Sequence, residues 1–194
     1  MHNIYTTKAI IIKSVPIGEA NKLFFLLTKD LGFIKATAQG VRLAKSKLKY
    51  SLQDFYCANI SLVRGKEIWR ITSAQNTKQV KLVGNLDKIY VVKNIFSLLL
   101  RLIHGEEKNE KLFECVEEFY KFIFDSILSE EELKDLEILV VLRILHNLGY
   151  LKKMDSFDNY CNDNSIDIVM LKNFSLKRKQ AILEINASLK ETHL

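Results

Sequence analysis

Short apolar runs and turn-forming residues alternate through the first 80 positions with the period of two that is typical of β-strands. In FIKATAQ, residues 33–39, the side chains of Ile34, Ala36 and Ala38 share one face, and Phe33, Lys35 and Thr37 share the other. Similar apolar or alternating segments recur along the chain at 8–15, 22–28, 54–63 and 67–75. The pattern therefore predicts five short strands.

The longest connection in this region lies between the third and fourth expected strands. Five antiparallel strands closed into a small barrel, with a long third connection, describe an OB-fold. A different small barrel, such as an SH3-like one, or an open meander would also satisfy the strand count. We expect the OB-fold for residues 1–80.

The pattern changes to helical spacing after residue 80. We expect helices over 87–104, 109–128, 129–149 and 174–190, with a polar and irregular stretch between the last two. Ser129 and Glu132 form a capping-box signature, and Gly149 stands where a helix would end. Because the middle of 129–149 is apolar nearly all round, this helix should lie at the centre of a bundle. The fold class is α+β, with an all-α helical bundle over 81–194.

Charge is divided unevenly between these two parts. The net charge of the 194 residues is +6. Residues 1–80 hold 13 Lys and Arg against 4 Asp and Glu, whereas the remainder holds 16 against 19. No acidic residue lies between Asp30 and Asp54. Such an imbalance indicates that the barrel faces phosphate or another polyanion.

Residue patterns for catalysis or metal binding are missing from the sequence. Lys45-Ser46 could end a phosphate-binding loop, but positions 39 and 44 lack the required glycines. The four histidines are isolated, and Cys57, Cys115 and Cys161 have no ligand spacing. We therefore expect no enzymatic activity, no cofactor and no metal.

Basic residues interleaved with aromatic rings are the remaining candidate site. Cations neutralise phosphates, and exposed rings offer stacking surfaces to unpaired bases. The alternative is a solvated loop above core aromatics, and for Trp69 core burial and stacking have equal weight. The candidate nucleic-acid-binding residues are Lys35, Arg42, Lys45, Lys47, Lys49, Arg64, Lys66, Arg70, Phe33, Tyr50 and Trp69.

Several short motifs hold their order and spacing over residues 5–76. They are Gly18-Glu19-Ala20, the Thr-x-x-x-Gly of residues 28–32, the Ala-x-Gly-x-Arg of residues 38–42 and the Leu-Gln-x-Phe of residues 52–55. This region resembles the N-terminal domain of the bacterial RecO recombination mediators. Beyond residue 80 the resemblance is carried by helices and the run LRILHNLGYL.

The resemblance implies an OB-fold followed by a helical domain that binds single- and double-stranded DNA and anneals complementary strands. It also implies work with RecR and RecA, and contact with the acidic tail of single-stranded DNA-binding protein. Many members carry a four-cysteine zinc motif after the LGY segment, where this sequence has only Cys161. We therefore expect no zinc, and a helical domain shorter than in most members.

Two other functions remain open at this point. An RNA-binding OB protein would share the same electrostatics, and a protein-interaction scaffold would bind an acidic peptide instead. Such a peptide could bind two basic clusters, Lys152-Lys153 and Lys177-Arg178-Lys179. A solvated surface is the favoured interpretation of both. The N-terminus is not typical of a signal peptide, and apolar runs are short, so we expect a soluble, cytoplasmic, nucleoid-associated protein without membrane contact.

Overall fold

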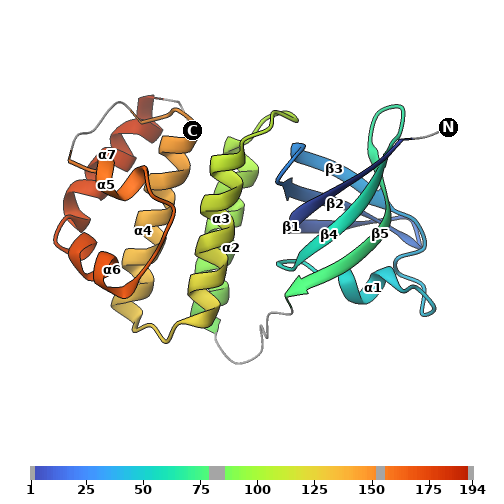
Figure 1. Ribbon diagram of the computed structural model, residues 1–194, viewed down its shortest axis with the longest axis horizontal. Helices are drawn as coiled ribbons and strands as arrows, with labels where there is room; N and C mark the ends of the chain where they lie inside the picture. Colours follow the sequence, from blue (N-terminus) through green and yellow to red (C-terminus); the bar gives the residue numbers. More distant parts are fainter. Residues whose placement is uncertain (1–2, 79–85, 152–155, 192–194) are drawn as a thin grey trace. The chain divides into compact units, whose positions relative to one another are not determined.

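The computed structural model describes residues 3–78, 86–151 and 156–191, which form two compact units (Figure 1). The first unit holds the described residues up to 78 together with 103–113. The second holds 86–102 and the described residues from 114 onward. The predicted boundary at residue 80 lies outside the described residues. The sequence did not predict that 103–113 would join the first unit.

The first unit is a closed five-stranded barrel. Its elements are β1 (Ile4–Ile17), β2 (Asn21–Thr28), β3 (Gly32–Ala38), α1 (Leu48–Ser51), β4 (Cys57–Arg64) and β5 (Trp69–Lys78). The strand order is β1-β2-β3-β5-β4, with β3 and β5 parallel and the other pairs antiparallel. This is the order of an OB-fold, so the prediction is confirmed, and the SH3-like and meander alternatives fall away.

Strand β1 closes the barrel because its two ends have different neighbours. Its first half pairs with β4, with Ile4 opposite Val63, and its second half pairs with β2, with Ile17 opposite Asn21. The pairing with β2 shifts register between Ile11 and Lys13. Such a bulge increases the local bend and twist, which lets one strand serve both neighbours.

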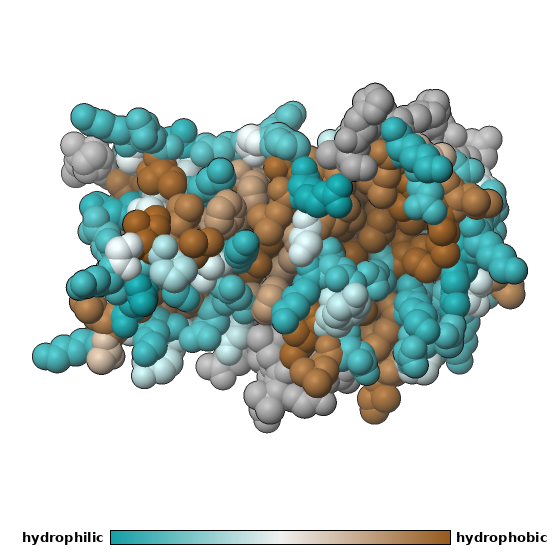
Figure 2. All heavy atoms as spheres, turned by 180° about the vertical axis from the view of Figure 1, so that it is seen from behind, coloured by the Kyte–Doolittle hydropathy of each residue, from teal (hydrophilic) through white to brown (hydrophobic). Residues whose placement is uncertain are grey.

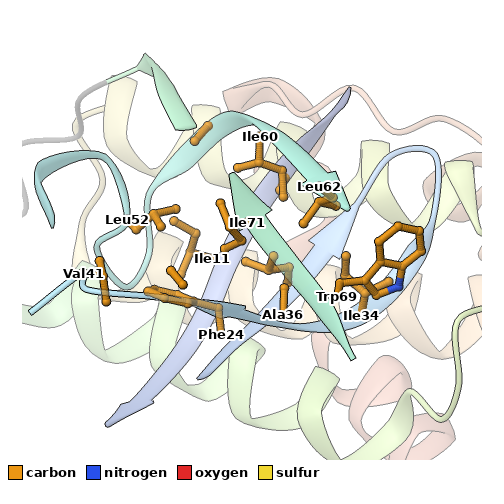
Figure 3. Packing of buried hydrophobic residues seen from close by; sticks show 14 residues of the cluster. Ile11, Phe24, Ile34, Ala36, Val41, Leu52, Ile60, Leu62, Trp69 and Ile71 are labelled. Carbon is orange, nitrogen blue, oxygen red and sulfur yellow. The ribbon is translucent and has the colours of Figure 1, made fainter. Parts of the chain in front are cut away.

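The barrel core follows the alternation predicted from the sequence. Ile34, Ala36 and Ala38 are 1%, 0% and 0% exposed, so one face of β3 points inward as expected. In Figure 3, Val41 and Leu52 lie at one end of the core and Trp69 at the other. The connection between β3 and β4, which includes α1, therefore closes one end of the barrel.

The second unit consists of helices. They are α2 (Leu86–Leu102), α3 (Glu110–Asp125), α4 (Glu130–Asn147), α5 (Asp158–Cys161), α6 (Ile168–Ser175) and α7 (Arg178–Glu191), of which α3 has its first four residues in the first unit. Helix α4 packs against α2, α5, α6 and α7, which confirms its predicted central place. The Ser129 side chain accepts from the backbone N–H of Glu132 at 3.3 Å, and the Glu132 carboxylate accepts from the Ser129 N–H at 2.9 Å. The predicted capping box is therefore present.

The helix predicted over 174–190 is present as α7 (Arg178–Glu191), but it begins four residues later than expected, after a separate helix α6. The chain turns between α6 and α7, with the Lys177 N–H donating to the Phe174 carbonyl at 2.8 Å. Helix α6 begins within the stretch expected to be irregular, and the Asp167 carboxylate caps it by accepting from the Met170 N–H at 2.7 Å. Within the described ranges, no helix is both long and apolar enough to cross a bilayer.

Candidate functional site

All eight candidate cations are exposed on the first unit, where they form two groups. The connection cations follow β3 along the chain and comprise Arg42, Lys45, Lys47 and Lys49. The groove cations lie on β3, on β5 and at the β4–β5 hairpin, and comprise Lys35, Arg64, Lys66 and Arg70. Within the parts that the structure describes, Arg64 alone among the eight is recorded in an ion pair. The predicted excess of positive charge on the barrel is therefore largely uncompensated.

The connection cations stand on a segment that is anchored to the β1–β2 turn. The Gly40 N–H donates to the Asn21 side-chain oxygen at 2.9 Å, and the Arg42 N–H donates to the Ala20 carbonyl at 2.9 Å. The Arg42 guanidinium also donates from Nη1 to the Gly18 carbonyl at 2.7 Å. A carbonyl acceptor leaves the net charge of the arginine in place. The segment is therefore ordered while its cations remain available to an anion.

Three of the groove cations, Arg64, Lys66 and Arg70, line a depression of about 500 Å³ between β3 and the β4–β5 hairpin, whereas Lys35 lies outside its lining. Thr37 and Arg70 are neighbours in the parallel β3–β5 pairing, and both line it. The complete lining is Thr37, Val63, Arg64, Gly65, Lys66, Glu67, Ile68 and Arg70. The loop between strands 4 and 5 of an OB-fold is a common place for oligonucleotides to bind. Three cations around one depression suit a phosphate chain.

Strand β3 links the two groups. Lys35 and Thr37 lie on the face of β3 opposite the buried Ala36, and the strand then continues into the segment that carries Arg42. The Lys35 ammonium lies 5.6 Å from the centre of the Phe25 ring on the neighbouring strand. A nucleic-acid strand that followed the outer face of β3 would pass from the groove cations to the connection cations.

Two of the three candidate aromatic side chains are buried. Trp69 is 5% exposed and Phe33 is 8% exposed, so neither presents a free ring face. For Trp69 this is the core alternative that the sequence left open. Tyr50, on α1 beside Lys49, is 71% exposed, and its ring is accessible for stacking.

Sequence reasoning missed one residue at this site, Glu106. Its carboxylate pairs with the Arg64 guanidinium and accepts from the Trp69 indole Nε1 at 3.2 Å. The guanidinium lies 4.7 Å from the centre of the indole ring, and Tyr5 meets the same ring edge-on at 5.3 Å. Because 42 residues separate Arg64 from Glu106, no local pattern could have joined them.

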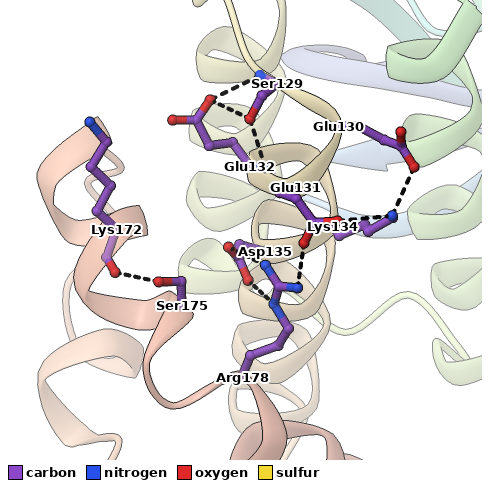
Figure 4. A network of polar contacts seen from close by, with 9 residues as sticks. All are labelled: Ser129, Glu130, Glu131, Glu132, Lys134, Asp135, Lys172, Ser175 and Arg178. Atoms are coloured by element: carbon purple, nitrogen blue, oxygen red, sulfur yellow. Dashed lines mark hydrogen bonds and ion pairs between the residues drawn. The ribbon is translucent and has the colours of Figure 1, made fainter.

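Two members of the run Lys177-Arg178-Lys179 make contacts inside the second unit, and Figure 4 shows those of Arg178. Arg178 donates from Nη2 to the nearly buried Asp135 carboxylate at 2.8 Å and from Nη1 to Glu131 at 2.6 Å, and these hydrogen bonds raise the pKa of Arg178. The Lys177 ammonium donates to the Ser156 carbonyl at 2.6 Å. Lys152 and Lys153 lie outside the described residues. The run is therefore chiefly structural.

Chemistry based on metals or thiols has little support in the described ranges. They contain no group of three or more His, Cys, Asp or Glu side chains placed to hold a metal ion. The three cysteines are free and buried. Burial raises the pKa of Cys115 to about 12 and that of Cys161 to about 11, so both thiols are protonated at neutral pH.

Some apolar side chains remain exposed beside the cations. Leu43, within the connection, is 56% exposed, and Ile17 at the β1–β2 turn is 43% exposed. Figure 2 shows hydrophobic areas interrupted by hydrophilic side chains on the face that it displays. Leu43 and Tyr50 therefore give the connection exposed apolar surface.

A sequence model of one protein family matches the barrel. The family is described as "Recombination protein O N terminal", and the match covers residues 1–80. These are the residues that supply every strand and all eight candidate cations.

Proteins named DNA repair protein RecO are similar to parts of this chain. The protein from Dehalococcoides mccartyi strain 195 is 44% identical over 71 residues, which cover 37% of this chain and 28% of the relative. The protein from Thermoanaerobacter sp. strain X514 is 26% identical over 77% of this chain and 60% of the relative. The protein from Clostridium novyi is 29% identical over 76% of this chain and 57% of the relative. In these matches the chain spans 60% or less of the relative's length.

Proposed function

Because the chain belongs to the RecO family through its barrel domain, we propose that it is a DNA-binding protein of recombinational repair. The observation that carries the proposal is the set of eight exposed cations on the barrel, seven of which are recorded without a carboxylate partner in the described ranges. A surface of this kind holds phosphates without reading base sequence. Because single- and double-stranded DNA both carry phosphates, we expect the surface to bind both.

Annealing of complementary strands is the activity that we propose for this surface. Two strands repel each other through their phosphates, and a cationic surface that holds one strand lowers the free energy needed to bring up the second. Base pairing then drives the reaction, so neither nucleotide hydrolysis nor a metal is required. Tyr50 and Leu43, both exposed on the connection, would contact the unpaired bases before annealing.

Salt dependence tests the cation assignment. If about five cations contact phosphates, the logarithm of the affinity for a single strand should fall against the logarithm of salt concentration with a slope of about −3.5. Replacing Lys45, Lys47 and Lys49 with alanine should flatten that slope by about 2 and weaken binding to every sequence. These lysines are chosen because, unlike Arg42, none donates a hydrogen bond to the β1–β2 turn in the described structure.

A matched control removes the same charge from the second unit. Lys172, Lys179 and Lys190 are exposed there, and their triple alanine variant should bind with the wild-type slope. Equal loss of affinity in both triple variants would mean that net charge, rather than the connection, determines binding. Wild-type affinity in the Lys45, Lys47 and Lys49 variant would remove the connection from the site.

An annealing assay with two complementary fluorescent oligonucleotides, run without nucleotide or metal, tests the activity. Competition between matched DNA and RNA strands separates a DNA protein from an RNA-binding one, since only contacts to the 2′-hydroxyl distinguish them. Affinity for an isolated acidic peptide with none for oligonucleotides would favour the interaction-scaffold alternative.

Protein partners form a further part of the proposal, and they rest on family membership. We expect RecR, and the acidic tail of single-stranded DNA-binding protein, to bind the chain, and RecA loading to be assisted indirectly. To test this, the purified chain, RecR and RecA would be mixed with single-stranded DNA coated by single-stranded DNA-binding protein. The rate of RecA filament formation would then be measured. No acceleration would limit the role to DNA binding and annealing.

A further inference from the structure

Arg64 borders the groove, but a carboxylate from a distant part of the chain neutralises its charge. The Arg64 side chain is 47% exposed and the Glu106 side chain 41%, so their ion pair lies at the solvent boundary. Glu106 also accepts from the Trp69 indole N–H at 3.2 Å. The two oxygens of the Glu106 carboxylate thus contact the Arg64 guanidinium and the Trp69 N–H, and two oxygens of a phosphate could make the same two contacts.

Other contacts hold Glu106 in this place. Lys29 pairs with Glu110 at 3.2 Å, close to Glu106 in the sequence. Gly32 approaches the backbone of Glu107 so closely that a Cβ built on Gly32 would lie 2.1 Å from the Glu107 carbonyl oxygen. The loop over 103–109 is therefore fixed to the β2–β3 turn, and attraction to Arg64 is not needed to bring Glu106 near.

The other cations that line the groove lack an equivalent partner. In the part of the chain that the structure describes, neither Lys66 nor Arg70 is recorded in an ion pair. Arg64 therefore differs from Lys66 and Arg70, because its charge is available to a phosphate only when the Glu106 carboxylate moves away.

We propose that Glu106 is an internal competitor for the phosphate site at Arg64. A phosphodiester group of bound nucleic acid displaces the Glu106 carboxylate and takes over the guanidinium, which stays above the Trp69 ring. This inference rests on the proposed function, because it concerns the same surface. Exposed ion pairs are weak, so a phosphate chain already held by neighbouring cations is able to break this one. The competitor lowers affinity modestly and favours ligands that also engage Lys66 and Arg70.

Charge removal at Glu106 tests the proposal. Glu106→Gln keeps an oxygen that can accept from the Trp69 indole while abolishing the charge that neutralises Arg64. We expect about two- to fivefold tighter binding of a single-stranded oligonucleotide. The salt slope should stay close to that of the wild type, because Arg64 contacts a phosphate in both complexes. Glu107→Gln removes the same charge from the same loop without touching a recorded partner of Arg64, and should change affinity by less than about 1.5-fold.

A double-variant cycle with Arg64→Ala separates competition from a general charge effect. If Glu106 acts through Arg64, the gain from Glu106→Gln should vanish in the Arg64→Ala background. Equal gains from Glu106→Gln and Glu107→Gln, a gain that survives without Arg64, or weaker binding by Glu106→Gln would each overturn the proposal.

Trp69, the sole tryptophan of the sequence, supplies a second measurement. Displacement of Glu106 removes a hydrogen-bond acceptor from the indole, so saturating the wild type with oligonucleotide should change the Trp69 emission. In Glu106→Ala the emission before binding should already resemble that of the saturated wild type. Unchanged emission on saturation would contradict displacement. Absence of any oligonucleotide binding by the wild type would instead overturn the proposed function, so the two failures are distinguishable.

Discussion

Arg42 donates from its guanidinium Nη1 to the carbonyl oxygen of Gly18 at 2.7 Å, and this bond ties the segment after β3 to the β1–β2 turn. The two residues belong to separate motifs of the family resemblance, Gly-Glu-Ala and Ala-x-Gly-x-Arg. Their contact gives a physical reason for both motifs to occur together. It also means that Arg42 serves the fold as well as the candidate site.

Replacing Arg42 with alanine should therefore reduce the stability of the barrel. Losing this hydrogen bond should lower the free energy of unfolding by about 1 kcal/mol, as measured by urea denaturation. Lys45→Ala is the matched control, because it removes the same charge from an exposed position of the same segment, and it should change stability by less than about 0.5 kcal/mol. Equal effects would show that the hydrogen bond contributes nothing measurable.

Gly32 should tolerate substitution less well than Gly18. Both have positive φ, at +70° and +57°, so alanine at either site should lower stability by about 1–2 kcal/mol through backbone strain alone. At Gly32 the added Cβ would also meet the Glu107 carbonyl oxygen, whereas nothing lies within 4 Å at Gly18. Denaturation of both variants should show a larger loss for Gly32→Ala, and an equal loss would mean that the 103–109 loop moves away freely.

Arg143 should be essential for the second unit. It is fully buried and donates to the carbonyls of Tyr160, Asn164 and Ser165 at 2.6, 3.0 and 3.0 Å. Arg143→Met keeps an unbranched apolar side chain but leaves these three carbonyls without the Arg143 donor, and should lower stability by about 3 kcal/mol. Arg101→Met, at an exposed position of α2, serves as the control and should have little effect on the thermal unfolding midpoint.

Cys115 should make the folded state sensitive to alkali. Burial raises the pKa of its thiol from 9.0 to about 12, so the unfolded chain loses this proton at lower pH than the folded chain does. The corresponding stabilisation is complete below pH 9 and is lost as pH rises from 9 towards 12. Unfolding by urea at pH 8 and at pH 10.5 measures the loss.

The Cys115→Ala variant should lose less stability than the wild type between those two pH values. An equal loss would assign the alkaline sensitivity to other groups. At pH 8 the native protein should also react slowly with a thiol reagent at all three cysteines, because all are buried, and quickly once unfolded.

The strands of the barrel were predictable because the alternation of apolar and polar residues is a pattern among neighbouring residues. Alternation along β3 determines which side chains point inward, and the observed burial of Ile34, Ala36 and Ala38 follows it. Helix α4 was predictable for the same reason, since Ser129 and Glu132 cap it within one turn. The exposed cations followed from charge counting, which needs no knowledge of tertiary contacts.

The features that sequence did not predict depend on contacts between distant residues. Residues 174–190 contain no proline or glycine, yet the chain turns between α6 and α7, and Arg178 at the start of α7 pairs with Asp135 and Glu131 on α4. Trp69 could be stacking surface or core by composition, and only barrel closure buries it. Glu106 reaches Arg64 across 42 residues and left no periodic signal.

The double pairing of β1 also bears on the order in which the chain folds during synthesis. Ile4 meets Val63, so the barrel is unable to close until the ribosome has released nearly all of β4, and pairings this far apart in sequence form slowly. The capping box and turns of α4 need only a few neighbouring residues. A nascent chain halted before β4 would therefore expose the unpaired edge of β1, and such an edge invites association with another chain.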